Sequence, residues 1–520
     1  MTQINFRYIL SISLFLLFTF LLTWVFFIPY NDIGYALLGS LASVSLLLPI
    51  FTGIVKRDFL WWNPVNFFCI ILFLAYPLRF IQFYLFPDDA PPELFIPYLK
   101  DKFLSYEIIF VTLFAGLSYF IGNWISSKII KNYDSSTKKI LKKLSNLDDV
   151  FLINQEIHFL YNSLLICIVF GLSARFLAIA LGVYSGFTNV SNPDALVNAT
   201  PLFILDEYNR IAFAIAWISL IISFRIRIPI NLRFISLIYL IQELLFLLFV
   251  RGSKTFLLLF MIFPLFYYAI DESYKQTKTK HKKIIPSWIM YIVLGIIGYY
   301  LLTIIFDFVL IYRYNYIKIV GYEFQLSPNL IEVTTQTLSD MLAATYQDNA
   351  SFNQGATVGE RFTGADTLAY IINQVPKQVN FVYFQDVLII PLSFIPRFIL
   401  PFKPAPILGR IAIDELGNGY SGLSLFIFGE GYLNWGLLGV VLTMFSFAFF
   451  HNFMISLLKK FLITQRLFIC FLPLLFYAFF SPDSTLITGI SKAITMILAF
   501  SPIWYLVYKF GRKLKSSILI

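Results

Sequence analysis

Long apolar segments constrain this chain more than any other feature of its sequence. About twelve stretches are long and apolar enough to cross a bilayer, which takes roughly 20 residues of helix. Because lipid offers the backbone no hydrogen-bond partners, we expect each stretch to be an α-helix. The predicted spans are 8–28, 33–54, 64–86, 104–125, 160–182, 209–224, 234–250, 255–270, 288–311, 434–456, 467–483 and 485–508.

The composition excludes a water-soluble protein. Hydrophobic residues make up 59% of the 520 residues and charged residues only 13%, whereas soluble domains carry about 25% charged residues. So few charged side chains cannot cover the surface of a soluble fold. We therefore exclude a soluble enzyme, a nucleic-acid-binding domain and a disordered chain, and we predict an all-α polytopic integral membrane protein.

The distribution of cations predicts the orientation of the chain. With the N-terminus in the cytoplasm, the cytoplasmic segments hold 24 of the 39 Lys and Arg residues and the external segments hold 11. Seven of those 11 lie in one long loop, where the positive-inside rule has little force. The net charge of +10 thus reflects a cytoplasmic excess of cations, and we expect both termini to be cytoplasmic.

One external loop is far longer than a connection requires. The predicted domains are 1–311 with transmembrane helices 1–9, a large periplasmic or extracellular loop at 312–433, and 434–520 with transmembrane helices 10–12 and a cytoplasmic tail. Loops beyond about 15 residues are usually functional or disordered, and this one is rich in apolar residues, which favours short helices on the membrane surface. Prolines interrupt its most apolar part, 384–400, which indicates a re-entrant or interfacial segment.

Cations gather on the predicted external face. Arg251 and Lys254 lie on a very short external turn, against the positive-inside rule, and together they suit a phosphate or diphosphate at headgroup depth. The alternative is snorkelling to ordinary lipid headgroups. Arg361, Arg397 and Lys403 lie in the long loop and extend the predicted anion site.

Charges inside the predicted spans also need partners or an aqueous cavity, because a charge at mid-bilayer costs roughly 2.5–3.5 kcal/mol on insertion scales. Of these, Arg175 and Glu243 are candidates to pair with one another. The other intramembrane charges are Arg79, Asp307 and Lys492, and each is open to a functional or a helix-packing role.

Neither histidine nor cysteine is expected to act as a catalytic or metal-binding residue on the external face. His158, His281 and His451 all fall on the predicted cytoplasmic side, and the three cysteines lie singly in apolar runs without a metal-ligand spacing. External catalysis would therefore use carboxylates, cations, hydroxyls and backbone. The candidate carboxylates are Glu360, Asp366, Asp414, Glu415 and Glu430.

Several short motifs occur in a suggestive order. They are Arg251-Gly252-Ser253-Lys254, then Glu360-Arg361-Phe362-Thr363-Gly364-Ala365-Asp366, then Pro396-Arg397 and Lys403-Pro404, and finally Gly429-Glu430-Gly431-Tyr432-Leu433-Asn434-Trp435-Gly436. In this order and spacing the chain resembles the bacterial oligosaccharide repeat-unit polymerases, the Wzy-type O-antigen and capsule polymerases. The resemblance is closest over residues 240–450.

The resemblance implies a glycosyltransferase of the bacterial inner membrane with a GT-C-like architecture. Its substrates would be undecaprenyl-diphosphate-linked oligosaccharides, joined at the outer face into the O-antigen of a lipopolysaccharide or another surface polysaccharide without a metal or cofactor. Membrane lipids, a chain-length regulator and a flippase would be its partners, and nucleic acid would not. Arg251, Lys254, Arg361, Arg397 and Lys403 would bind the diphosphate or an acidic glycan. Glu430, Tyr432 and Asn434 would hold the sugar, and either Glu430 or Asp366 would be the catalytic base.

Three other functions stay open at this point. An O-antigen ligase would carry a histidine in the large outer loop, and this loop has none. A lipid-linked oligosaccharide flippase or transporter would keep its outer loops short. A purely structural assembly partner would need no catalytic residues.

Overall fold

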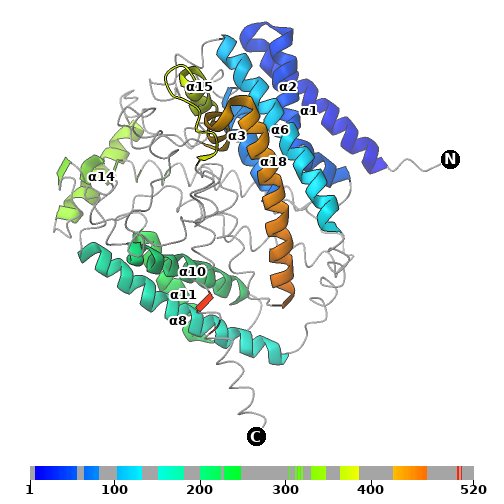
Figure 1. Ribbon diagram of the computed structural model, residues 1–520. Coiled ribbons are helices and arrows are strands. Elements are labelled where there is room, and N and C mark those ends of the chain that lie inside the picture. The colour runs from blue at the N-terminus through cyan, green and yellow to red at the C-terminus, as the bar shows by residue number, and fades with distance from the viewer. Residues whose placement is uncertain are drawn as a thin grey trace.

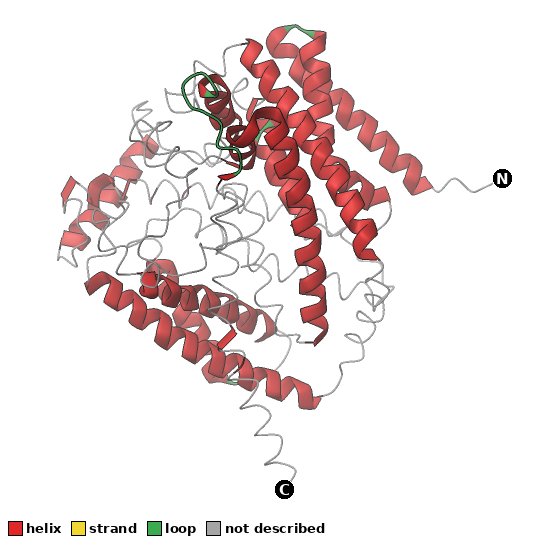
Figure 2. Ribbon diagram, viewed as in Figure 1, coloured by secondary structure: helices red, strands yellow, loops and turns green. Residues whose placement is uncertain are grey.

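The computed structural model of the chain is helical throughout its described part (Figure 1; Figure 2). It describes residues 6–55, 64–80, 102–131, 150–180, 200–223, 228–246, 329–346, 364–385 and 426–464, with single residues and short pieces between 304 and 319 and between 501 and 505. No strand occurs among these residues. The all-α prediction is therefore confirmed for the described part of the chain.

Helices cover eight of the twelve predicted spans. They are α1 (Phe6–Tyr30), α2 (Ile33–Val55), α3 (Pro64–Ala75), α6 (Lys102–Lys131), α8 (Val150–Ala180), α10 (Thr200–Ser223), α11 (Ile230–Phe246) and α18 (Phe426–Thr464). Two further helices, α14 (Asn329–Tyr346) and α15 (Gly364–Gln374), lie within the range predicted to form the large external loop. The predicted spans 255–270, 288–311, 467–483 and 485–508 lie outside the described residues, apart from isolated positions.

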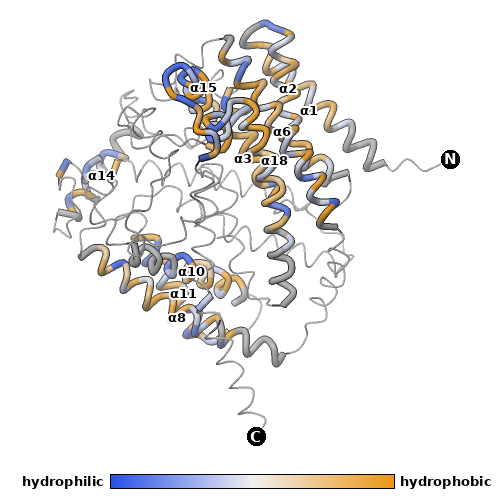
Figure 3. Tube along the Cα trace, in the orientation of Figure 1, coloured by the Kyte–Doolittle hydropathy of each residue, from blue (hydrophilic) through white to orange (hydrophobic). Residues whose placement is uncertain are grey.

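Four described helices are long and apolar enough to cross a membrane. These segments are Ile33–Gly53, Leu104–Ile129, Leu160–Ala178 and Phe426–Phe453. Shorter apolar helices cover Phe15–Ile28, Val65–Phe80 and Tyr208–Ile221. In Figure 3 apolar residues run along α2, α6 and α18, and polar residues gather at α15 and the turn that follows it. The chain thus has the helices of a membrane protein.

A tight turn joins α1 to α2 at the predicted external side. Asn31 has a φ of 47°, a left-handed conformation that asparagine tolerates better than most residues. Asp32 then caps α2, because its Oδ1 accepts hydrogen bonds from the backbone N–H groups of Gly34 at 2.9 Å and Tyr35 at 3.2 Å. The two apolar helices therefore pack side by side as a hairpin.

The helices α6 and α18 pack closely along their length. A Cβ on Gly122 would lie only 2.9 Å from the carbonyl oxygen of Phe445, so a small residue is required there. The hydroxyl of Ser118 donates to the carbonyl of Val441 at 2.6 Å, which adds a hydrogen bond across the interface. With α1, α2, α3 and α15, these two helices form one packed group (Figure 1).

One buried histidine in this group pairs with a tyrosine of a neighbouring helix. The imidazole Nδ1 of His451 lies 2.9 Å from the hydroxyl of Tyr119, and the rings of Phe68 and Phe447 surround it. His451 is fully buried, so it has a packing role in this structure. Cys69 and Cys167 are free and buried, in keeping with their prediction as small hydrophobic residues.

A second group consists of α8, α10 and α11, which pack on one another (Figure 1). The exposed side of α11 is strongly apolar, as Ile230 and Phe234 illustrate with exposed fractions of 79% and 63%. Such a surface suits contact with lipid chains rather than with water. Elsewhere, α14 packs through Val333 on Tyr312 and Tyr316, so this contact joins two parts of the range predicted to form the large external loop.

Candidate functional site

Four of the predicted site residues lie on elements that pack together. The helix α15, which carries Asp366, packs on α3, α6 and α18, and α18 carries Glu430, Tyr432 and Asn434. In Figure 1, α15 lies beside the start of α18 and near the end of α3. We call the group Arg79, Glu107, Asp366, Glu430, Tyr432 and Asn434 the α15–α18 site.

Close contacts hold α15 in place. A Cβ on Gly364 would lie 2.9 Å from the ring of Tyr76, and a Cβ on Gly429 would lie 2.6 Å from the Cδ1 atom of Ile371. The Tyr76 ring in turn stacks on Phe428, with the ring centroids 4.0 Å apart. Glycine at these two positions therefore lets α15 approach both neighbours closely.

Asp366 forms a buried ion pair with Arg79. The guanidinium Nη2 donates to Oδ2 at 3.0 Å, and Nε donates to Oδ2 at 3.1 Å and to Oδ1 at 3.3 Å. The exposed fractions are 0% for Asp366 and 1% for Arg79. Burial raises the pKa of the Asp366 carboxyl above its ordinary value, and the charge and hydrogen bonds of Arg79 oppose that shift. The pair ties the start of α15 to the segment that follows α3.

Glu430 and Asn434 are also buried, each with an exposed fraction of 3%. The amide of Asn434 donates to the backbone carbonyl of Glu430 at 2.9 Å and accepts a hydrogen bond from the backbone N–H of Phe384 at 2.9 Å. The backbone N–H groups of Val382 and Tyr383 donate to the carbonyls of Leu433 and Asn434, each at 3.0 Å. Asn434 thus fastens the turn after α15 to α18.

The Gly429–Gly436 motif shapes the start of α18. Trp435 and Gly436 leave the helical conformation, with φ values of −163° and +57°, so α18 consists of two helical parts joined at a kink. A Cβ on Gly431 would lie 2.8 Å from the Cα atom of Val440, which shows that the short first part folds back on the second. The motif's glycines allow this turn.

Tyr432 reaches from this turn to α6. Its hydroxyl donates a hydrogen bond to Oε1 of Glu107 at 3.1 Å. Glu107 is exposed and lies in the first turns of α6, within the candidate span Leu104–Ile129, and Tyr432 is half-buried. The site therefore has one exposed carboxylate beside two buried ones.

The two carboxylates predicted as the catalytic base do not reach the surface. Asp366 is enclosed with Arg79, and Glu430 is 97% covered, so in this structure a substrate hydroxyl would meet neither. Their assignment as proton acceptors stays a prediction, and their burial argues against it. The predicted anion-binding residues Arg251, Lys254, Arg361, Arg397 and Lys403 lie outside the described residues.

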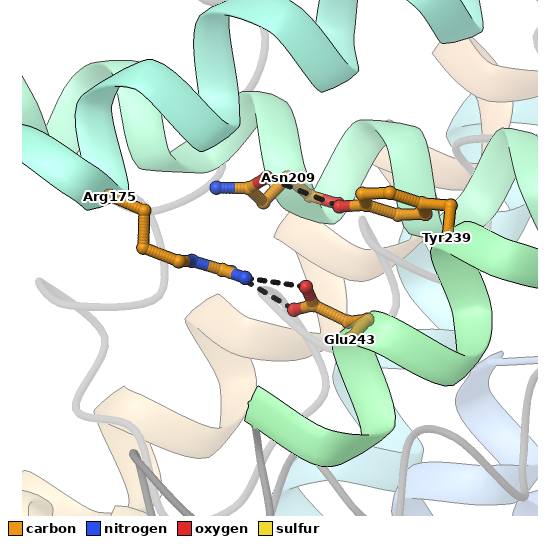
Figure 4. Close-up of polar contacts among 4 residues, drawn as sticks. All are labelled: Arg175, Asn209, Tyr239 and Glu243. Carbon is orange, nitrogen blue, oxygen red and sulfur yellow. Dashed lines mark hydrogen bonds and ion pairs between the residues drawn. The ribbon is translucent and has the colours of Figure 1, made fainter. Parts of the chain in front are cut away.

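A second buried ion pair lies in the other helix group (Figure 4). Nη1 of Arg175 donates to Oε2 of Glu243 at 2.6 Å and Nη2 donates to Oε1 at 3.0 Å, so α8 and α11 are joined by a bidentate pair. The ring of Phe246 lies 3.8 Å from the guanidinium carbon. Beside the pair, the hydroxyl of Tyr239 donates to the carbonyl of Asn209 at 2.8 Å. The predicted pairing of Arg175 with Glu243 is confirmed.

Two residues of the α15–α18 site were not predicted as members of it. Arg79 stands out in the sequence as an intramembrane charge, but its partner lies 287 positions away and nothing local points to it. In the sequence, Glu107 resembles an ordinary polar residue near the end of a transmembrane span. Among the described residues, no group of three or more His, Cys, Asp or Glu residues could hold a metal ion.

Comparisons with known proteins give no relative for this chain. No protein-family model, no curated protein and no solved structure matches it.

Proposed function

We propose that the protein is a membrane glycosyltransferase that polymerises undecaprenyl-diphosphate-linked oligosaccharide repeat units at the outer face of the bacterial cytoplasmic membrane. A hydroxyl group of one repeat unit attacks the anomeric carbon of the growing glycan. The bond from that carbon to the lipid diphosphate breaks, and the diphosphate leaves with the electron pair. Neither a nucleotide sugar nor a metal enters this proposal.

One observation carries the proposal. The end of α3, the start of α6, the helix α15 and the start of α18 pack together, and the cation distribution predicts that every one of these ends is external. The motif residues Asp366, Glu430, Tyr432 and Asn434 thus lie on two elements that pack together, and the predicted topology assigns both to one membrane boundary. A site at this boundary suits a substrate with a lipid tail and a polar glycan.

The proposed diphosphate site supplies the charge stabilisation. Arg251 and Lys254 hold the leaving diphosphate, and Arg361, Arg397 and Lys403 bind either the diphosphate or an acidic glycan. Cations aimed at the leaving oxygens stabilise the charge that develops there in the transition state. The predicted topology, with twelve spans and both termini in the cytoplasm, assigns all five cations to the outer side.

The test uses a strain of the source organism that lacks the gene and is complemented with variants. We expect Arg251→Ala to reduce the surface-glycan ladder to a single repeat unit while the protein stays in the membrane. A lost charge-assisted hydrogen bond to the diphosphate corresponds to a rate loss of about 10- to 100-fold. The control is Lys377→Ala, which removes an exposed lysine from another predicted external segment, the loop 312–433. If the Arg251→Ala variant gives a full surface-glycan ladder, Arg251 does not bind the diphosphate.

A further inference from the structure

The proposed reaction needs a group that takes the proton of the attacking hydroxyl. Such a group must contact the substrate, and a positioned carboxylate is suited to the task. Four described carboxylates lie on the elements at this end of the first helix group: Asp32, Glu107, Asp366 and Glu430. Asp366 and Glu430 are buried, as described above. Asp32 caps α2 through two backbone N–H groups.

Glu107 is the carboxylate of this set that is exposed and held in position. The hydroxyl of Tyr432 donates to its Oε1 at 3.1 Å, and within the described part of the chain Glu107 has no other hydrogen bond. One carboxylate oxygen is therefore fixed, and the other has no hydrogen-bond partner among the described residues and belongs to an exposed side chain that a substrate hydroxyl can meet. Tyr432 is itself fixed, because it belongs to the folded-back turn at the start of α18.

The surroundings of Glu107 suit a lipid-linked substrate. On the same face of α6, Phe110, Phe114 and Ile121 follow at helical spacing and are 41%, 36% and 47% exposed. The stretch from Glu107 to Ile121 is about 21 Å long at 1.5 Å per residue, which is most of the depth of a bilayer's hydrocarbon core. Glu107 thus lies at the outer end of a lipid-facing stripe.

The neighbouring helix also exposes apolar side chains. On α18, after the kink, Leu438 and Leu442 lie at helical spacing and are 49% and 41% exposed. The two helices join at the bond from Ser118 to Val441 and at the bond from the Asn452 amide to Asn123 Oδ1, which is 2.7 Å long. A polyprenyl chain beside these helices would keep its tail in the bilayer and its first sugars at the level of Glu107.

We propose that Glu107 is the catalytic base of this transferase and that Tyr432 is the residue that positions it; this rests on the proposed function. The acceptor hydroxyl gives its proton to the free carboxylate oxygen of Glu107 as its oxygen forms a bond to the anomeric carbon. The bond from that carbon to the diphosphate oxygen breaks in the same step, and its electron pair leaves with the diphosphate. The proton later passes from Glu107 to water, which restores the carboxylate.

The experiment uses the purified full-length protein in lipid nanodiscs. Its probe is the undecaprenyl-diphosphate-linked repeat unit extracted from the deletion strain, and the measured quantity is the initial rate of polymer formation. We expect Glu107→Gln to lower the rate by about 100-fold or more, in line with the loss of a general base. Tyr432→Phe keeps the carboxylate but loses the bond that orients it, and we expect a loss of about 10-fold. Glu332→Gln, the same change at an exposed glutamate of α14, is the control and should keep the wild-type rate.

The outcomes separate the two proposals. If the wild type forms polymer and Glu107→Gln stays within twofold of it, the base is another group and the proposed function stands. If Glu107→Gln loses activity and melts like the wild type, the base assignment is supported. If it is inactive but unstable, Tyr432→Phe decides, because a rate equal to that of the wild type overturns the assignment. If the wild type forms no polymer from this probe, the proposed function fails and the base assignment fails with it.

Discussion

Replacing Arg79 with methionine tests whether its ion pair with Asp366 holds α15 against the end of α3. Methionine has a similar length and keeps the apolar contacts of the arginine stem, but it removes the guanidinium. The carboxylate of Asp366 would then lose three contacts of 3.0–3.3 Å while its exposed fraction is 0%. No water reaches it to replace them.

Because both partners are buried, the expected loss of stability is that of a broken buried ion pair. Breaking a buried pair by removing one partner costs about 3–5 kcal/mol, because the other charge stays buried without compensation. Replacing both partners with apolar residues of similar volume is often neutral. We therefore expect Arg79→Met and Asp366→Leu each to lower the stability of the protein strongly, and the double variant to be more stable than either single variant.

The assay is the apparent melting temperature of the protein purified in detergent, compared across the wild type, both single variants and the double variant. Lys377→Ala serves as a control, since its exposed ammonium group lies 3.5 Å from the side chain of Asn373 and makes no buried contact. The expected order is wild type, then the double variant, then the two single variants. A double variant whose loss equals the sum of the two single losses would refute the reasoning, because independent sites add and coupled sites do not.

Two further predictions concern the other ion pair and the topology. Arg175→Met leaves Glu243 buried without its bidentate partner, so it should cost about 3–5 kcal/mol; a melting temperature equal to that of the wild type would show that α8 and α11 do not depend on the pair. In a variant without native cysteines, a cysteine at Ser351 should react with a membrane-impermeant reagent in intact spheroplasts; labelling only after lysis would overturn the external position of 312–433.

The length of the apolar segments predicted most of the described helices. The segment 33–54 corresponds to α2 at Ile33–Val55, and 104–125 falls within α6 at Lys102–Lys131. Helices in lipid satisfy their backbone internally, so hydrophobic length alone locates them. The ends are less well predicted. The helix α8 begins at Val150, ten residues before its predicted span, and continues through the polar residues Asn154, Gln155 and Glu156.

The pairing of charges was only partly predictable. Arg175 and Glu243 stand out because each interrupts an apolar run, and a buried charge needs a partner. The partner of Arg79 could not be found in this way, because Asp366 lies in a predicted loop where a carboxylate is unremarkable. No sequence feature marked Glu107 as a site residue. Its bond to Tyr432 depends on how α18 folds back at Gly436. That turn is visible only in the tertiary structure, so the sequence alone could not predict the contact.

The surface glycan of a strain that lacks the gene tests the central claim most directly. If the protein polymerises repeat units, the strain will carry a single repeat unit on its lipid carrier or on the acceptor of the surface glycan, and complementation will restore the ladder. Long chains that accumulate on the lipid carrier would instead indicate a ligase. The absence of any repeat unit outside the membrane would indicate a flippase, and either result would contradict the proposed polymerisation.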